Sequence, residues 1–252
     1  MPSGTLRRAA LVIAIACAAA VTACGGGGLF RQQYEYEEEL YLQLDGSVTA
    51  YVNASVAALV ALRGADLNVD PRSRPEREKL RALFAAPGAR VTTPTFSRRG
   101  GRRFVHVRVD VGDVRQLARI APFAWSTYQF ERKGDVFVYT QVVGKPAGKP
   151  LTGAGWTGDE MVSFKMHLPS RIPFNNSPKP VQRGNILQWE QPLADRLAGE
   201  RLDIEAQLEP QSILYSTLLL FAGTVVAAAL TFAVVIWWVA RKGRGEQLQS
   251  PL

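Results

Sequence analysis

Cysteine and histidine are nearly absent from this chain of 252 residues, which holds two of each. Both cysteines, Cys17 and Cys24, lie near the N-terminus, so the remainder of the chain cannot form an internal disulfide. His106 and His167 are far apart and have no Cys nearby, so no spacing typical of a zinc site occurs. We therefore expect no disulfide, no metal and no cofactor, and packing of the core must stabilise the fold.

Recognisable catalytic motifs are also missing. The serines next to predicted strands lack the Gly-x-Ser-x-Gly elbow of hydrolases: Ser97, Ser163 and Ser170. Asp159 and Glu160 are adjacent, so in a strand they point to opposite faces and make a poor acid–base pair. Both histidines fall in predicted strands, where a neutral imidazole on a sheet face is the expected role. We expect no catalytic residues and no enzyme activity.

The positive charge of the chain comes partly from its two ends. The formal net charge is +8, from 30 Lys and Arg against 22 Asp and Glu. Removing Arg7, Arg8, Arg241, Lys242, Arg244 and Glu246 leaves 25 basic and 21 acidic residues, a net charge of +4. This modest excess argues against nucleic acid as a partner. Within it, residues 63–108 hold 12 basic and 4 acidic side chains.

The N-terminus has the pattern of a lipoprotein signal peptide. Arg7 and Arg8 precede an apolar stretch too short to span a bilayer, and Val21-Thr22-Ala23-Cys24 follows as a lipobox. We predict a signal peptide over residues 1–23, lipid attachment at Cys24 and a flexible tether over residues 24–33. Ordinary secretory cleavage after Ala23 and an uncleaved anchor are the alternatives.

The C-terminus predicts a transmembrane helix over residues 213–240. Residues 216–239 carry no charge and, at 1.5 Å per residue, span about 36 Å. Tyr215 at one edge and Trp237 with Trp238 at the other are typical interfacial aromatics. Arg241 and Lys242 follow, so the positive-inside rule places the tail, residues 241–252, in the cytoplasm and the domain outside the plasma membrane.

Between these ends the sequence predicts an α+β fold: mainly antiparallel sheet with a few short helices, an all-β C-terminal segment and the one C-terminal transmembrane helix. Residues 34–143 are predicted as an α+β domain, residues 144–158 as a Gly/Pro-rich spacer, and residues 159–212 as a β-rich segment that packs with that domain. We predict helices over residues 54–63 with Asn53 as the cap, 75–84, and 113–120. The acidic run Glu37 to Glu39 is expected to be a solvated edge.

Two surface features attract attention. Arg98, Arg99, Arg102 and Arg103 surround a Gly-Gly turn, where four guanidinium groups could bind anionic headgroups through paired hydrogen bonds. The alternative is a solvated tip that keeps an edge strand from pairing. Trp156, in the spacer, is expected either to insert at a membrane interface or to fill the domain's own core.

The order of features resembles a known family. A lipobox is followed by a strand with Asp45-Gly46-Ser47 and by a basic hairpin. The stretches Phe164-Lys165-Met166-His167-Leu168-Pro169, Phe174-Asn175-Asn176 and Gly184-Asn185-Ile186-Leu187-Gln188-Trp189-Glu190 come next, and a transmembrane helix with a basic tail ends the chain. This pattern resembles the LppM-like (DUF3153) bacterial lipoproteins. The resemblance implies an α+β envelope domain without a general catalytic assignment, and some members are associated with cell-envelope glycolipids.

These features lead us to expect a non-enzymatic, membrane-proximal binding or adaptor module. Its partners would be membrane lipids, envelope glycolipids or another membrane protein. An accessory subunit of an envelope assembly is the alternative, and an envelope hydrolase with an unrecognised site is a lesser one.

Overall fold

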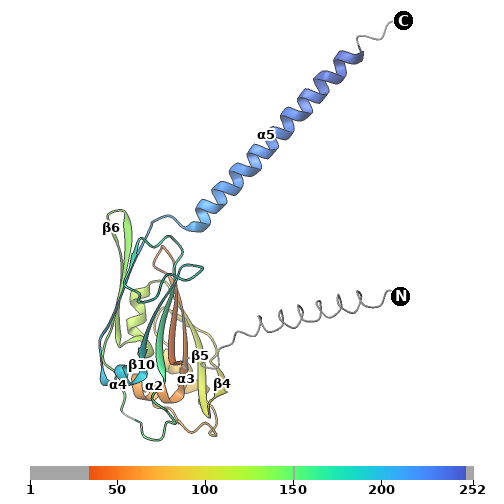
Figure 1. Ribbon diagram of the computed structural model, residues 1–252. Helices are drawn as coiled ribbons and strands as arrows, with labels where there is room; N and C mark the ends of the chain where they lie inside the picture. Colours follow the sequence, from red (N-terminus) through yellow and green to blue (C-terminus); the bar gives the residue numbers. More distant parts are fainter. Residues whose placement is uncertain (1–33, 150, 248–252) are drawn as a thin grey trace, which may run out of the picture. The chain divides into compact units, whose positions relative to one another are not determined.

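The computed structural model describes residues 34–149 and 151–247. The predicted signal peptide, Cys24 and the tether therefore lie outside the described residues, as does the end of the tail. The described chain forms two β-sheets with short helices, followed by one long helix (Figure 1). The α+β class expected from the sequence is confirmed.

The larger sheet has seven strands in the order β10-β8-β1-β2-β5-β3, with β4 also paired to β5. Its strands are β1 Tyr34–Leu42, β2 Val48–Ser55, β3 Ala89–Val91, β4 Thr95–Arg99, β5 Arg102–Val111, β8 Met161–His167 and β10 Ile186–Pro192. β1 and β8 run parallel, whereas the remaining pairs are antiparallel. Tyr36, Leu40 and Leu42 are buried on one face of β1 because successive strand residues point to opposite faces. The other face of the sheet carries half-exposed polar side chains.

The smaller sheet has four strands in the order β6-β7-β11-β9. They are β6 Ser126–Lys133, β7 Val136–Val143, β9 Phe174–Asn175 and β11 Leu202–Leu208. Tyr128 on β6 and Gln141 on β7 donate hydrogen bonds to Glu38 on β1, so this sheet packs on the apolar face of the larger one. The C-terminal segment supplies strands to both sheets, with β8 and β10 in one and β9 and β11 in the other.

Short helices connect and cover the strands. They are α2 Val56–Arg63, α3 Arg77–Phe84, α4 Leu193–Ala198 and the 3-10 turns η1 Val114–Arg119 and η2 Ala121–Phe123. Ser55, not Asn53, caps α2, because β2 continues through Ser55 and its Oγ accepts from the Ala58 N–H at 2.9 Å. The expectation of strands alone after residue 158 is wrong at α4, a run of good helix formers that ends at Gly199 in the left-handed conformation.

The predicted spacer packs against the domain. The Ala147 N–H donates to the Leu62 carbonyl of α2 at 2.9 Å, and the Gly144 N–H donates to the Trp125 carbonyl at 2.7 Å. The Trp156 indole is partly buried against the core and donates to Glu35 at 3.1 Å. Of the two roles expected for Trp156, the structure shows the one inside the domain.

The long helix α5 covers Ile213–Gln247, and its part Ile213–Val239 is long and apolar enough to cross a membrane. Tyr215, Trp237 and Trp238 are exposed on it at 57–59%. The Arg241 guanidinium lies 5.3 Å from the Trp237 ring centre. The helix continues beyond residue 240, so Lys242 and the first part of the predicted tail are helical. The Ile213 N–H donates to the Pro169 carbonyl at 3.1 Å, which ties the start of α5 to the end of β8.

Candidate functional site

The basic hairpin does not present four free guanidinium groups. Arg98 is exposed, yet it donates to the Pro71 carbonyl at 2.7 Å. Arg103 is only 5% exposed and donates to the same carbonyl and to the Ser73 hydroxyl. One loop, residues 71–73, is therefore held by an arginine from β4 and by another from β5.

Arg102 is also committed to the interior. Its side chain is 11% exposed and forms ion pairs with Glu35 at 3.0 Å and Glu160 at 3.7 Å, both of which are buried. Backbone N–H groups of residues 157 and 158 donate to Glu160 as well, and they lower the pKa of that carboxyl against the upward effect of burial. The expected exposure of this tip is thus wrong for Arg102 and Arg103, which hold loops together.

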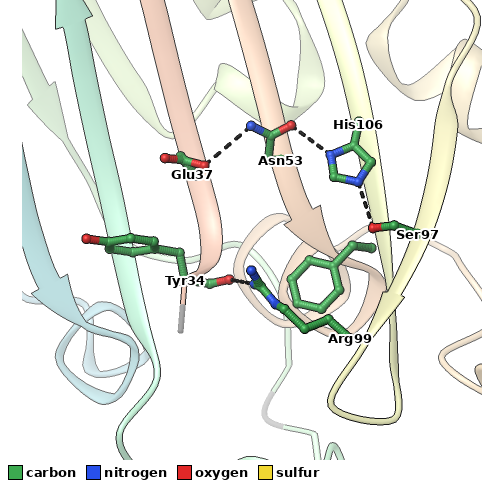
Figure 2. Close-up of a pocket in the computed structure, with 7 residues that line it drawn as sticks. Tyr34, Glu37, Asn53, Ser97, Arg99 and His106 are labelled. Carbon is green, nitrogen blue, oxygen red and sulfur yellow. Dashed lines mark hydrogen bonds between the residues drawn. The ribbon is translucent and has the colours of Figure 1, made fainter. Parts of the chain in front are cut away.

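A pocket of about 200 Å³ opens on the polar face of the larger sheet, beside this hairpin (Figure 2). Its lining comes from four strands and consists of Tyr34, Glu37, Asn53, Ser97, Arg99, Phe104 and His106. The strand register aligns Glu37 with Asn53 and Asn53 with His106 in one row across β1, β2 and β5. Ser97 of β4 pairs with Phe104 of β5, and His106 lies two residues further along β5 on the same face. Ser97 is therefore the diagonal neighbour of His106 and extends the row to β4.

These side chains form a continuous hydrogen-bonded relay. Asn53 Nδ2 lies 3.4 Å from Glu37 Oε2, Asn53 Oδ1 lies 2.9 Å from His106 Nδ1, and His106 Nε2 lies 2.8 Å from Ser97 Oγ. An ionised carboxylate only accepts, so Asn53 presents its NH₂ to Glu37 and its carbonyl oxygen to His106. His106 then carries its proton on Nδ1 and leaves Nε2 as the acceptor for the Ser97 hydroxyl.

The surroundings keep His106 neutral. Burial lowers its pKa first, the nearby Arg99 guanidinium lowers it further, and Glu37 opposes both. Arg99 donates to the Tyr34 carbonyl, and its guanidinium stacks 4.2 Å from the Phe104 ring centre. The pocket therefore combines a neutral base, an exposed hydroxyl and a fixed cation.

The rest of the polar face is paired in the same way. Lys165 pairs with Glu37, His167 pairs with Glu39, and Tyr41 stacks on His167 with ring centres 3.9 Å apart. The expectation of a solvated acidic edge is wrong because β1 is an interior strand. Glu38 points the opposite way, into the space between the sheets, where burial raises its pKa to about 7.

Sequence reasoning missed this site because it considered Ser97 and His106 separately and assigned Asn53 to a helix cap. A signal for part of it was present. A hairpin closed by Gly100 and Gly101 pairs Ser97 with Phe104, which places Ser97 diagonal to His106. In the described parts of the chain, no group of three or more His, Cys, Asp or Glu side chains is placed to hold a metal ion.

No protein-family model matches the chain, and no curated protein matches it. Among solved structures, it is similar to the NMR structure of the folded domain of the LppM protein of Mycobacterium tuberculosis. The TM-score is 0.40 and the identity 13%, with coverage of 73% of this chain and 95% of that chain. That neighbour shares its name with the family that the sequence resembles, but at this score the likeness assigns neither family nor function.

Proposed function

We propose that the chain is a membrane-anchored envelope protein whose domain binds the polar headgroup of an envelope lipid or glycolipid. The binding site is the pocket of Figure 2, on the extracytoplasmic side of the membrane. The observation that carries the proposal is the pocket's lining, in which hydrogen-bonding side chains from four strands converge beside aromatic rings.

The chemistry of the lining suits a hydroxyl-rich headgroup. Glu37 accepts hydrogen bonds, Arg99 donates them, and the hydroxyl of Ser97 can do either. Tyr34 and Phe104 also line the pocket, and the Arg99 guanidinium lies over the buried Phe104 ring, so little of that ring is open to a ligand. At about 200 Å³ the pocket is smaller than a typical drug-sized site, so it would accept part of a headgroup and not acyl chains.

The anchor supports a membrane ligand. The part of α5 from Ile213 to Val239 has the length and composition of a span, and the basic residues Arg241, Lys242 and Arg244 follow that part. The pocket row lies five residues along β1 from Leu42, about 17 Å from the end of the sheet where α5 begins. If that end faces the bilayer, an extended headgroup of several sugars is favoured over a single phosphate.

Calorimetric titration of a soluble diglycoside into full-length protein in detergent tests the proposal, because α5 alone would carry the protein into any vesicle. Arg99→Gln should weaken binding of the diglycoside, whereas Arg108→Gln, on the same face but outside the pocket, should not. No binding of the diglycoside by the folded wild-type protein would remove the pocket as a headgroup site.

A further inference from the structure

We infer that Ser97 is a nucleophile that attacks an acyl ester, with His106 as its general base and Asn53 as the positioning residue that orients His106. This activity departs from the expectation that the chain is not an enzyme. It rests on the proposed function only in that the ester would be carried on the headgroup bound in the same pocket, and would not be one that links the acyl chains of the lipid.

The relay contains each element of an activated serine. The base lies within hydrogen-bond reach of the hydroxyl, at 2.8 Å, and its other ring nitrogen is held by a third side chain at 2.9 Å. Glu37 determines which end of the Asn53 amide faces His106, and Lys165 pairs with Glu37 in turn. Each hydrogen bond of the relay therefore has a defined donor and acceptor, and the lone pair of His106 Nε2 points at the Ser97 hydroxyl.

The exposure of Ser97 and the cation in its pocket are also consistent with a nucleophilic serine. Ser97 is exposed on β4, which pairs only with β5 among the described strands, so a substrate can approach its hydroxyl from the open side. Arg99 lies two residues further along β4 and lines the same pocket. A guanidinium carries five N–H donors, and one of those of Arg99 goes to the Tyr34 carbonyl. The cation thus lines the pocket onto which the hydroxyl opens, and it would attract the negative charge that develops on an ester oxygen bound there.

The reaction balances without a cofactor. Ser97 Oγ bonds to the acyl carbon, and its proton passes to His106 Nε2. The ester C–O bond breaks, and the alcohol leaves with that proton. Water then attacks the acyl-serine, His106 takes a proton from the water and returns it to Ser97 Oγ, and the carboxylic acid is released.

A fluorophosphonate probe tests the nucleophile directly on full-length protein in detergent. We expect one modified serine, located at Ser97 by peptide mass spectrometry. Ser97→Ala should abolish the modification. His106→Ala should slow it by roughly 100-fold. The control Ser47→Ala removes a half-exposed serine in the β1–β2 turn and should not change labelling.

The pH profile separates general-base action from a structural role. Labelling should fall as His106 gains a proton, with an apparent pKa below the ordinary value of about 6.5, because burial and the nearby Arg99 guanidinium lower the pKa of His106 against the opposing effect of Glu37. Arg99→Gln should shift this fall to higher pH. Asn53→Ala should slow labelling without changing thermal stability by as much as a core substitution.

The Ser97→Cys variant provides a second test, which does not depend on whether the Ser97→Ala protein folds. Its thiol should react with iodoacetamide faster than in the Ser97→Cys/His106→Ala protein, because the imidazole stabilises the thiolate. The inference would be overturned by a folded protein whose Ser97 resists the probe at every pH, together with a Ser97→Cys thiol that reacts independently of His106. Diglycoside binding without labelling would leave the proposed function standing, whereas labelling without diglycoside binding would reject the headgroup and keep the nucleophile.

Discussion

Glu38 is buried, although the sequence predicts that the acidic run containing it is a solvated edge. It lies in the acidic run Glu37 to Glu39, yet it is in phase with Tyr36 and Leu40 and is only 1% exposed. Tyr36, Tyr128 and Gln141 donate hydrogen bonds to it, and these partly offset the effect of burial on its pKa. A carboxyl with a raised pKa favours the protonated form in the folded state.

This raised pKa predicts a loss of stability with rising pH. Between about pH 4.5 and 7 the unfolded chain releases the Glu38 proton while the folded chain retains it, which costs about 3 kcal/mol in all. Glu38→Gln should remove this contribution, so its melting temperature should fall less than that of the wild type over that range. Thermal unfolding of full-length protein at pH 4.5, 6 and 7.5 measures the difference. Parallel pH profiles for the two proteins would show that Glu38 does not titrate as described.

The arginines of the β4–β5 hairpin should differ sharply in their effect on stability. Arg102→Ala removes the guanidinium that forms ion pairs with buried Glu35 and Glu160, which should cost about 3–5 kcal/mol. Arg98→Ala, at an exposed neighbour, should change stability by about 0.5 kcal/mol or less. Melting temperatures of the two variants provide the comparison, and a similar small loss in both would contradict the buried network. Replacing all four arginines would therefore disturb the fold and cannot test headgroup binding.

At the scale of elements, the Gly/Pro-rich segment between β7 and β8 packs against the domain and does not hang free of it. Composition alone describes residues 144–158 as a spacer, because no periodic pattern is present. In the structure its backbone bonds to α2, and Gly148 lies so close to α2 that an added Cβ would meet the Val60 and Ala61 carbonyl oxygens at 2.1 and 2.2 Å. Only the absence of a side chain permits this approach.

Gly148→Ala should therefore separate the segment from α2. Backbone oxygens cannot turn aside as a flexible side chain would, so the substitution should cost about 1–3 kcal/mol. Amide hydrogen exchange should rise in residues 144–149 and in the last turn of α2. Gly112→Ala is the control, because a Cβ there meets nothing within 4 Å. Unchanged exchange in the Gly148→Ala protein would mean that the segment is not docked.

At the scale of the whole domain, the register places the basic hairpin and the start of α5 at opposite ends of the larger sheet. Val111 pairs with Val48 and Phe104 with Ser55, so these ends are about 24 Å apart along β5. α5 begins beside Pro169, at the Val48 end. The segment between β8 and β10, which includes β9, holds Arg171 and Arg183, and its Phe174 and Val181 are 46% and 42% exposed. If α5 spans a membrane, we expect this segment, and not the arginine hairpin, to meet the bilayer.

Site-specific labelling should show this orientation. With Cys17 and Cys24 replaced by Ser, a bimane label at Val181→Cys in nanodisc-embedded protein should be quenched by a lipid-attached nitroxide, and a label at Arg98→Cys should not. A label at Leu219→Cys within α5 serves as the control for insertion. Quenching at position 219 with equal quenching at 98 and 181 would mean that the domain lies on its side. No quenching at position 219 would mean that α5 does not span the membrane.

The sequence by itself determined what local chemistry dictates. Local helix signals predicted α2, α3 and η1 to within two residues, and an uncharged run predicted α5. Lipid attachment at Cys24 and the direction of the span stay predictions. Only the tertiary structure decided which strands meet. The parallel pairing of β1 with β8 brings Lys165 to Glu37, and the β2–β5 register brings Asn53 to His106. These contacts join residues far apart in the chain, so the relay to Ser97 and the burial of Arg102 and Glu38 depend on packing that no local pattern records.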